Sequence, residues 1–145
     1  MIKSLASVEG LKADGLIRQV SVSTRNTVLV IDDEEAIREA VEDILSLYGV
    51  PVVAAANGEQ GLALFATHQA TIGLVLLDLT LPGLKGEVVY YHLQEINPNV
   101  PIIISSGYRQ QSLGLTLPSD VHFLPKPYDL TKLMDTVHRF LPPKP

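Results

Sequence analysis

The sequence predicts a single α/β domain built on a doubly wound, five-stranded parallel sheet. The chain has 145 residues, 46% hydrophobic and 19% charged, which suits one compact core. From Thr27 onward, short β-rich runs without polar alternation are interleaved with amphipathic helical patterns. This order predicts right-handed crossovers between parallel strands, and such sheets bind ligands at the carboxyl ends of their strands.

Five apolar segments are the predicted strands: 27–31 (TVLVI), 50–55 (VPVVAA), 72–77 (IGLVLL), 100–105 (VPIIIS) and 121–124 (VHFL). Residues 1–25 are mixed polar and small residues without a sustained period. We interpret 1–25 as an N-terminal tail or linker and 26–145 as the domain. The chain has room for a helix after the fifth strand but not for an output domain, so we expect either a single-domain protein or a piece of a larger one.

Helices between the strands are predicted from apolar residues that share one face and are therefore expected to be buried. The first predicted helix ends at Gly49, a later one ends before Pro98, and the last begins after the N-cap Asp129. Their shared faces are, in that order, Ile37, Val41, Ile44 and Tyr48; Val88, Val89, Leu93 and Ile96; and Leu130, Leu133, Met134, Val137 and Phe140.

The composition argues against several classes of protein. A formal charge of -5 provides no basic surface for a phosphate backbone, so direct nucleic-acid binding is not expected. The absence of Cys removes disulfides, thiolate zinc sites and cysteine nucleophiles. No apolar run approaches the roughly 18 residues of a membrane span, and the N-terminus lacks the apolar core of a signal peptide. We expect a cytoplasmic protein that does not bind membranes.

Polar residues follow four of the predicted strands at their carboxyl ends: Asp32 and Asp33, Asp78, Ser105 and Ser106, and Lys126. Three carboxylates at neighbouring strand ends repel one another and need a cation between them. Ligands that are all oxygen suit a hard ion such as Mg²⁺. A hydroxyl, a lysine and an acidic cluster at one edge of the sheet indicate phosphoryl chemistry.

These motifs resemble the bacterial response-regulator receiver domain, and "SSGY" and "FLPKPY" are most like receivers of hybrid histidine kinases. The resemblance covers about residues 26–141 and rests on five separated motifs in the right order. It implies a flavodoxin-like (βα)5 fold. It also implies a function in two-component signalling or a phosphorelay, in which a histidine kinase or histidine phosphotransfer protein donates a phosphoryl group to Asp78. Such a receiver takes part in its own phosphorylation and dephosphorylation and is not a conventional enzyme.

The resemblance also assigns roles to single residues. Asp32, Asp33 and Asp78 would hold Mg²⁺, together with the backbone carbonyl of Thr80. Asp33 has a second interpretation, since an acid just before a helix could serve only as its N-cap.

The remaining implied roles concern the phosphoryl group and the switch. Ser106 would hydrogen-bond the phosphoryl group, and Lys126 would pair with it and precede a cis Lys126–Pro127 bond. Phe123 stands at the aromatic position that rotates on activation, so Ser106 and Phe123 form the implied switch for a partner-binding surface.

The sequence departs from the family pattern in two places. Gly114 and Pro118 disfavour a long helix between the fourth and fifth strands, and we predict that 108–119 is a mobile, phosphorylation-sensitive surface. Lys85 replaces the acid or small polar residue that is common before Gly86. Flexible or closely packed backbone is expected in the loop that holds this glycine.

Two other functions remain open. A phosphate-independent pseudo-receiver would share the fold without using Mg²⁺. An aspartyl-phosphate hydrolase of the haloacid-dehalogenase type also uses a strand-end aspartate, but the second acid that it needs two residues later is Thr80 here. The sequence leaves open the cognate kinase, the output and the oligomeric state.

Overall fold

The computed structural model describes residues 25–107, 117, 118 and 120–141. Its strands are β1 (Thr27–Ile31), β2 (Val52–Ala55), β3 (Ile72–Asp78), β4 (Ile102–Ser106) and β5 (His122–Pro125). All neighbouring pairs are parallel, and the order across the sheet is β2-β1-β3-β4-β5. The predicted doubly wound sheet is therefore confirmed. Its strand order reverses between β1 and β3, which is where such sheets place their ligands.

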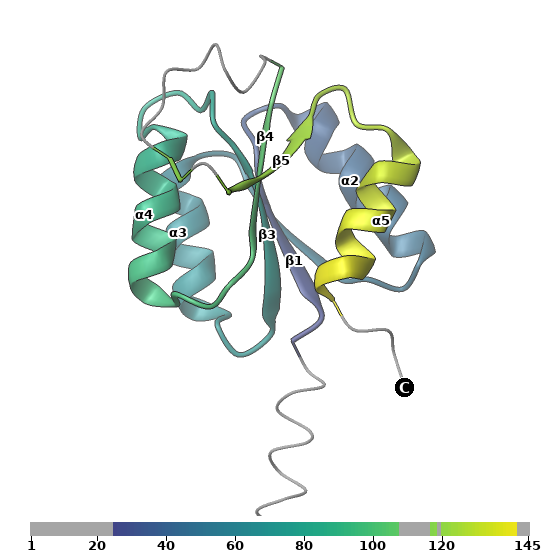
Figure 1. Cartoon of the computed structure of the whole chain (residues 1–145), viewed down its shortest axis with the longest axis horizontal. Helices are drawn as coiled ribbons and strands as arrows, with labels where there is room; N and C mark the ends of the chain where they lie inside the picture. Colours follow the sequence, from purple (N-terminus) through teal and green to yellow (C-terminus); the bar gives the residue numbers. More distant parts are fainter. Residues whose placement is uncertain (1–24, 108–116, 119, 142–145) are drawn as a thin grey trace, which may run out of the picture.

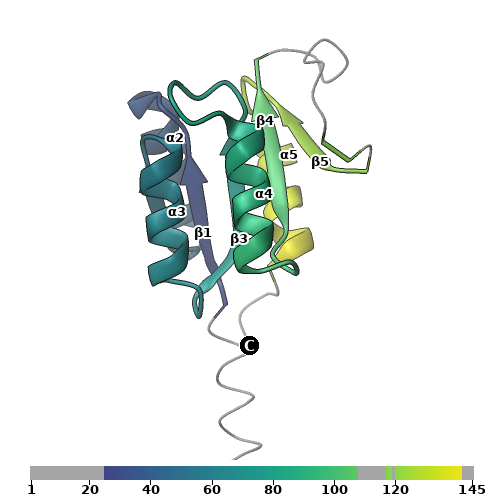
Figure 2. The ribbon, with the colours of Figure 1, turned by 90° about the vertical axis from the view of Figure 1, so that its left-hand side faces the viewer.

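The helices cover both faces of the sheet: α2 (Glu35–Leu47), α3 (Gly58–Thr67), α4 (Gly86–Ile96) and α5 (Leu130–Phe140). Figure 1 shows α3 and α4 on one face and α2 and α5 on the other. In Figure 2, which is turned by 90°, α3 and α4 lie in front of the sheet and α5 lies behind it. Three layers of this kind bury the central strands on both sides.

The burial of the central strands explains why they read as unbroken apolar runs. Alternate residues of one strand enter different cores, because successive side chains point to opposite faces. Leu29 and Ile31 of β1 join Phe65 of α3 in one core, whereas Val28 of β1 joins Val41 of α2 in the other. Polar residues on either face would lack water, so both sets are hydrophobic.

The structure confirms the predicted N-cap of α5 and reveals a capping signal at the start of α3. Asp129 caps α5, as predicted, and its side chain accepts hydrogen bonds from the backbone N–H groups of Thr131 and Lys132. For α3, no residues were predicted. Asn57 caps this helix by accepting from Gln60 N, and Gln60 Oε1 accepts from Ala56 N. This reciprocal pattern resembles a capping box, which the residues "NGEQ" could have indicated.

Three residues that were predicted to be buried are exposed: Leu130 by 57%, Tyr48 by 57% and Val88 by 36%. Leu130 and Val88 lie in the first turns of α5 and α4, before the first large buried residues of those helices. Tyr48 is the C-cap of α2 rather than part of its buried face, and its ring packs edge-on against His138, 5.9 Å away. Leu130 and Tyr48 lie at helix ends, beyond the buried turns of α5 and α2, whereas Val88 lies beside the side of α4 that buries Val89 and Leu93.

Some predictions fall on residues outside the described part of the chain. They include the tail over 1–24, most of the segment 108–119, and the helix between β4 and β5 that five strand–helix units would imply. The boundary of the domain at residue 26 stays a prediction. Among the described helices, none is long and apolar enough to cross a membrane.

Candidate functional site

The predicted site residues meet at the carboxyl edge of the sheet, which is uppermost in Figure 1. Asp78 ends β3 and Ser106 ends β4, while Asp32 follows β1 and Lys126 follows β5. The register places Asp78 beside Ser105 of β4. Because parallel strands end at the same edge, four segments that are distant in the sequence supply one site.

Three carboxylates form the centre of this site. Asp32, Asp33 and Asp78 each offer an oxygen, and these three oxygens lie within 4.8 Å of one another. The side chains of Asp32 and Asp78 are only 1% exposed, whereas Asp33 faces solvent. Two acids of the cluster are thus buried, and the third, Asp33, is accessible from solvent.

The ammonium group of Lys126 compensates part of this negative charge. Its Nζ lies 2.7 Å from Asp32 Oδ2, 3.2 Å from Asp78 Oδ2 and 3.5 Å from Glu34 Oε1. The side chain of Glu34 is 62% exposed, so its pairing with Lys126 is screened by water and weak. The two buried aspartates are therefore the main partners of the lysine.

Hydrogen bonds fix the orientation of both buried carboxylates. Asp32 Oδ1 accepts from Glu34 N at 2.9 Å. Asp78 Oδ1 accepts from both the backbone N–H and the hydroxyl of Thr80, each at 2.9 Å. Asp32 Oδ2, by contrast, receives no hydrogen bond of acceptable geometry within the described residues, although Lys126 Nζ is near. A buried carboxylate oxygen left this way is suited to a cation.

Burial acts in opposite directions on the pKa values of Asp32 and Lys126, but both pKa values lie above their usual ranges. Burial raises the pKa of the Asp32 carboxyl, and the Lys126 ammonium group 2.7 Å from Oδ2 opposes this rise only in part. Burial alone would lower the pKa of Lys126, but the close contact with Asp32 and the charge of Asp78 outweigh it and raise this pKa. The lysine therefore stays charged beside the two buried acids.

The structure separates the two interpretations of Asp33. The N-cap of α2 is Glu34, and its side chain makes no capping hydrogen bond. Asp33 precedes that cap, and its carboxylate belongs to the acidic cluster. The interpretation of Asp33 as the helix cap is therefore wrong.

The loop after Asp78 depends on two glycines. A Cβ on Gly86 would lie 2.5 Å from Leu79 Cα and 2.7 Å from the carbonyl oxygen of Asp78, so only glycine fits there. Gly83 has φ of 72°, a left-handed conformation that other residues rarely adopt. Lys85 is the N-cap of α4 and makes no side-chain capping bond. The start of α4 is thus packed tightly against the proposed acceptor but poorly capped.

The residues of the predicted switch have the expected positions, and their roles remain predictions. Ser106 is fully buried at the end of β4. Phe123 is partly buried and packs against the core that includes α3 and α4. The Lys126–Pro127 peptide bond is cis, as predicted.

Two contacts near the site were missed by sequence reasoning. The hydroxyl of Tyr128 donates to Ser105 Oγ at 2.8 Å, and burial raises the pKa of this phenol to about 12, so that it stays a donor. Arg38 Nη1 donates to the backbone carbonyl of Asp32 at 2.8 Å, across the turn from β1 to α2. Neither contact has a local sequence signal, because each depends on how distant or successive elements pack.

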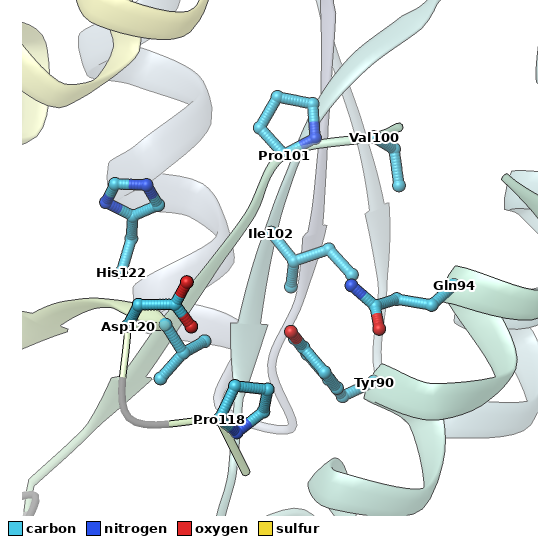
Figure 3. A pocket seen from close by; sticks show the side chains of 9 residues that line it. Tyr90, Gln94, Val100, Pro101, Ile102, Pro118, Asp120 and His122 are labelled. Atoms are coloured by element: carbon cyan, nitrogen blue, oxygen red, sulfur yellow. The ribbon is translucent and has the colours of Figure 1, made fainter. Parts of the chain in front are cut away.

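A cavity of about 300 Å³ lies between α4 and β5, away from the acidic cluster. Figure 3 shows Tyr90 and Gln94 reaching it from α4, while Asp120, from the chain before β5, and His122, at the start of β5, line another side. Pro101 and Ile102, where β4 begins, also line it. This cavity therefore lies at the amino end of β4, opposite Ser106, and is not part of the proposed phosphoryl site.

Comparison with known proteins agrees with this geometry. The family model described as "Response regulator receiver domain" matches residues 28–138. The sensor kinase CckA of Brucella abortus is 30% identical over 126 residues, covering 86% of this chain and 13% of the kinase. The sporulation initiation phosphotransferase F of Bacillus subtilis is 30% identical over 120 residues, covering 81% of this chain and 94% of that protein. This chain thus spans a small part of one relative and nearly all of the other.

A solved structure also resembles this chain. One chain of the CheX–CheY–BeF3–Mg²⁺ complex of Borrelia burgdorferi superposes with a TM-score of 0.68 at 25% identity. The match covers 78% of this chain and 87% of that one.

Proposed function

The chain belongs to the response regulator receiver domain family, and we propose that Asp78 is its phosphoacceptor. The domain is homologous to receivers of response regulators and sensor kinases, which act in two-component signal transduction. One observation supports this role of Asp78 above all. Its carboxylate ends β3 beside two further acids, and Lys126 Nζ lies 3.2 Å from one of its oxygens.

The proposed reaction transfers a phosphoryl group from a phosphohistidine to Asp78. A carboxylate oxygen of Asp78 attacks phosphorus, and a new P–O bond forms as the P–N bond to the histidine breaks. The electron pair of the P–N bond remains on the imidazole nitrogen, which takes up a proton. Lys126 would pair with the phosphoryl oxygens, because its charge already faces Asp78.

The acidic cluster fits Mg²⁺. It offers oxygen ligands alone, and Asp32 Oδ2 is buried without a hydrogen bond among the described residues. We propose Asp32, Asp33 and Asp78 as ligands, with the backbone carbonyl of Thr80. When bound there, the ion would neutralise charge on the phosphoryl oxygens. The Borrelia complex, which contains Mg²⁺ and BeF3 by name, supports this choice of metal.

The proposed partner is a histidine kinase or a histidine phosphotransfer protein in the cytoplasm. The likeness to CckA, a sensor kinase, and to a phosphotransferase of sporulation supports a donor of this class. After transfer, Ser106 would hydrogen-bond the phosphoryl group, and Phe123 would change its packing. Ser106 ends β4, the strand that pairs with β3, and this position supports its proposed contact with the phosphoryl group.

Phosphoramidate tests the function, because it carries the P–N bond of phosphohistidine in a small molecule. With Mg²⁺, the chain should gain one phosphoryl group and then lose it slowly, and chelation of Mg²⁺ should stop the gain. Rapid release of many phosphates per chain would instead indicate the hydrolase alternative. No gain at any Mg²⁺ concentration would indicate the pseudo-receiver alternative.

A further inference from the structure

Tyr128 joins the chain after Lys126 to the strand beside Asp78. Its hydroxyl donates to Ser105 Oγ at 2.8 Å, although the two residues are 23 positions apart. Ser105 is completely buried, and the ring of Tyr128 packs against the core that includes α2 and α5. The contact is therefore a hydrogen bond largely shielded from water, where a lost partner is costly.

Ser105 is well placed to transmit such a restraint. It pairs in register with Asp78 on one side and with Leu124 of β5 on the other. Its carbonyl oxygen accepts from Leu79 N at 3.0 Å, which fixes the chain just after Asp78. The serine thus links the strand of the proposed acceptor to the strand that leads to the lysine.

Two hydrogen bonds attach the chain around Lys126 to β4. The first is made by Lys126 itself, whose backbone N–H donates to the carbonyl oxygen of Ser106 at 3.0 Å. Two residues later, Tyr128 is attached to Ser105. Without the second hydrogen bond, the turn from β5 to α5 would be held to β4 only by the backbone N–H of Lys126.

We propose that Tyr128 is a positioning residue for Lys126: through its hydrogen bond to Ser105 it holds the turn that places Nζ between Asp32 and Asp78. This inference rests on the proposed function, since it concerns the transfer of a phosphoryl group to Asp78. A shift of the turn would lengthen the contacts of 2.7 Å and 3.2 Å that Nζ now makes. Small displacements of a charged group reduce the rate of a reaction that depends on its position.

Five variants and a control test the inference. Tyr128→Phe removes the hydroxyl and keeps the ring, Ser105→Ala removes its partner and leaves the ring untouched, and the double variant removes both. The remaining two are Lys126→Ala alone and Lys126→Ala combined with Tyr128→Phe. Tyr90→Phe is the matched control, because it also loses a phenol hydroxyl from a side chain that is only 5% exposed, in the cavity of Figure 3.

The rate of phosphoryl gain from phosphoramidate at saturating Mg²⁺ is the main readout, with the free energy of unfolding measured alongside. Tyr128→Phe and Ser105→Ala should each slow the gain roughly three- to tenfold, as expected for one hydrogen bond. The double variant should be no slower than either single one, because both remove the same contact. Tyr90→Phe should keep the wild-type rate even if its stability falls.

The Lys126→Ala background separates positioning from a merely structural role. There, Tyr128→Phe should leave the residual rate unchanged, because the residue acts through the lysine. An equal slowing with and without Lys126 would overturn the inference, as would a wild-type rate in Tyr128→Phe or in Ser105→Ala. If the wild-type chain itself gains no phosphoryl group on Asp78, the proposed function is wrong, and the inference that rests on it is wrong as well.

Discussion

Lys126 Nζ lies nearer to Asp32, at 2.7 Å, than to Asp78, at 3.2 Å. The lysine therefore neutralises the acidic pair as a whole rather than the proposed acceptor alone. This arrangement has opposite consequences for metal binding and for phosphoryl transfer. The positive charge of the lysine opposes a cation at the acidic cluster, yet it is needed when phosphoryl oxygens arrive.

Lys126→Gln should consequently change the two properties in opposite directions. The affinity for Mg²⁺ should rise roughly threefold or more, because a nearby positive charge is lost. Phosphorylation by phosphoramidate should slow roughly tenfold or more, because the developing charge loses a partner. Calorimetric titration and mass spectrometry measure the two quantities. A loss of Mg²⁺ affinity in this variant would contradict the described role of the lysine.

Asp33→Asn tests whether the exposed acid is a metal ligand. The affinity for Mg²⁺ should fall roughly tenfold, since one negative charge of the cluster is removed. Stability without metal should not fall, because Asp33 does not cap α2. Asp43→Asn is the control, since it removes an exposed acid of α2 that lies outside the cluster. Equal titrations of Asp33→Asn and wild type would exclude Asp33 from the metal site.

Lys85→Asp should stabilise the domain. Lys85 is the N-cap of α4 without a side-chain capping bond, and its charge faces the positive end of the helix dipole. An aspartate could cap the helix, and the free energy of unfolding should rise by about 1 kcal/mol. Urea denaturation measures this gain. Lys85→Ala removes the charge without adding a cap and should gain less, so equal gains would attribute the effect to charge alone.

Gly86→Ala should destabilise the domain by about 1–3 kcal/mol, because the added Cβ would overpack the loop after Asp78. The new atom would lie 2.5 Å from Leu79 Cα. Gly107→Ala is the matched control, since a Cβ there meets no atom of the described residues within 4 Å. The control should stay within about 0.5 kcal/mol of wild type. Similar unfolding curves for the two variants would show that the close approach at Gly86 is unimportant.

The sequence was most informative where one rule applies over a whole element. Central strands buried on both faces are apolar throughout, so they were visible as unbroken runs, and polar residues at the carboxyl ends of four strands marked the site. Asp78 and Lys126 were found in this way. Helix ends were less predictable: Leu130 has the right helical period but lies one turn before the buried part of α5.

Contacts between separate elements could not be predicted. The hydrogen bond from Tyr128 to Ser105 requires the β5–α5 turn to pack on β4, which no local pattern specifies. The bond from Arg38 to the carbonyl of Asp32 depends likewise on the angle at which α2 leaves the sheet. Such contacts follow from the packed structure, whereas the residues that carry the chemistry are visible from strand ends.

The most direct test of the central claim is intact-mass analysis after incubation with acetyl phosphate and Mg²⁺, followed by mapping of the modified residue. The wild-type chain should gain a single phosphoryl group, located on Asp78, and this gain should require Mg²⁺. Asp78→Asn should fold normally, as judged by its unfolding curve, and gain no phosphoryl mass. A gain in Asp78→Asn equal to that of wild type, or a phosphoryl group mapped to another residue, would contradict the assignment of Asp78 as the phosphoacceptor.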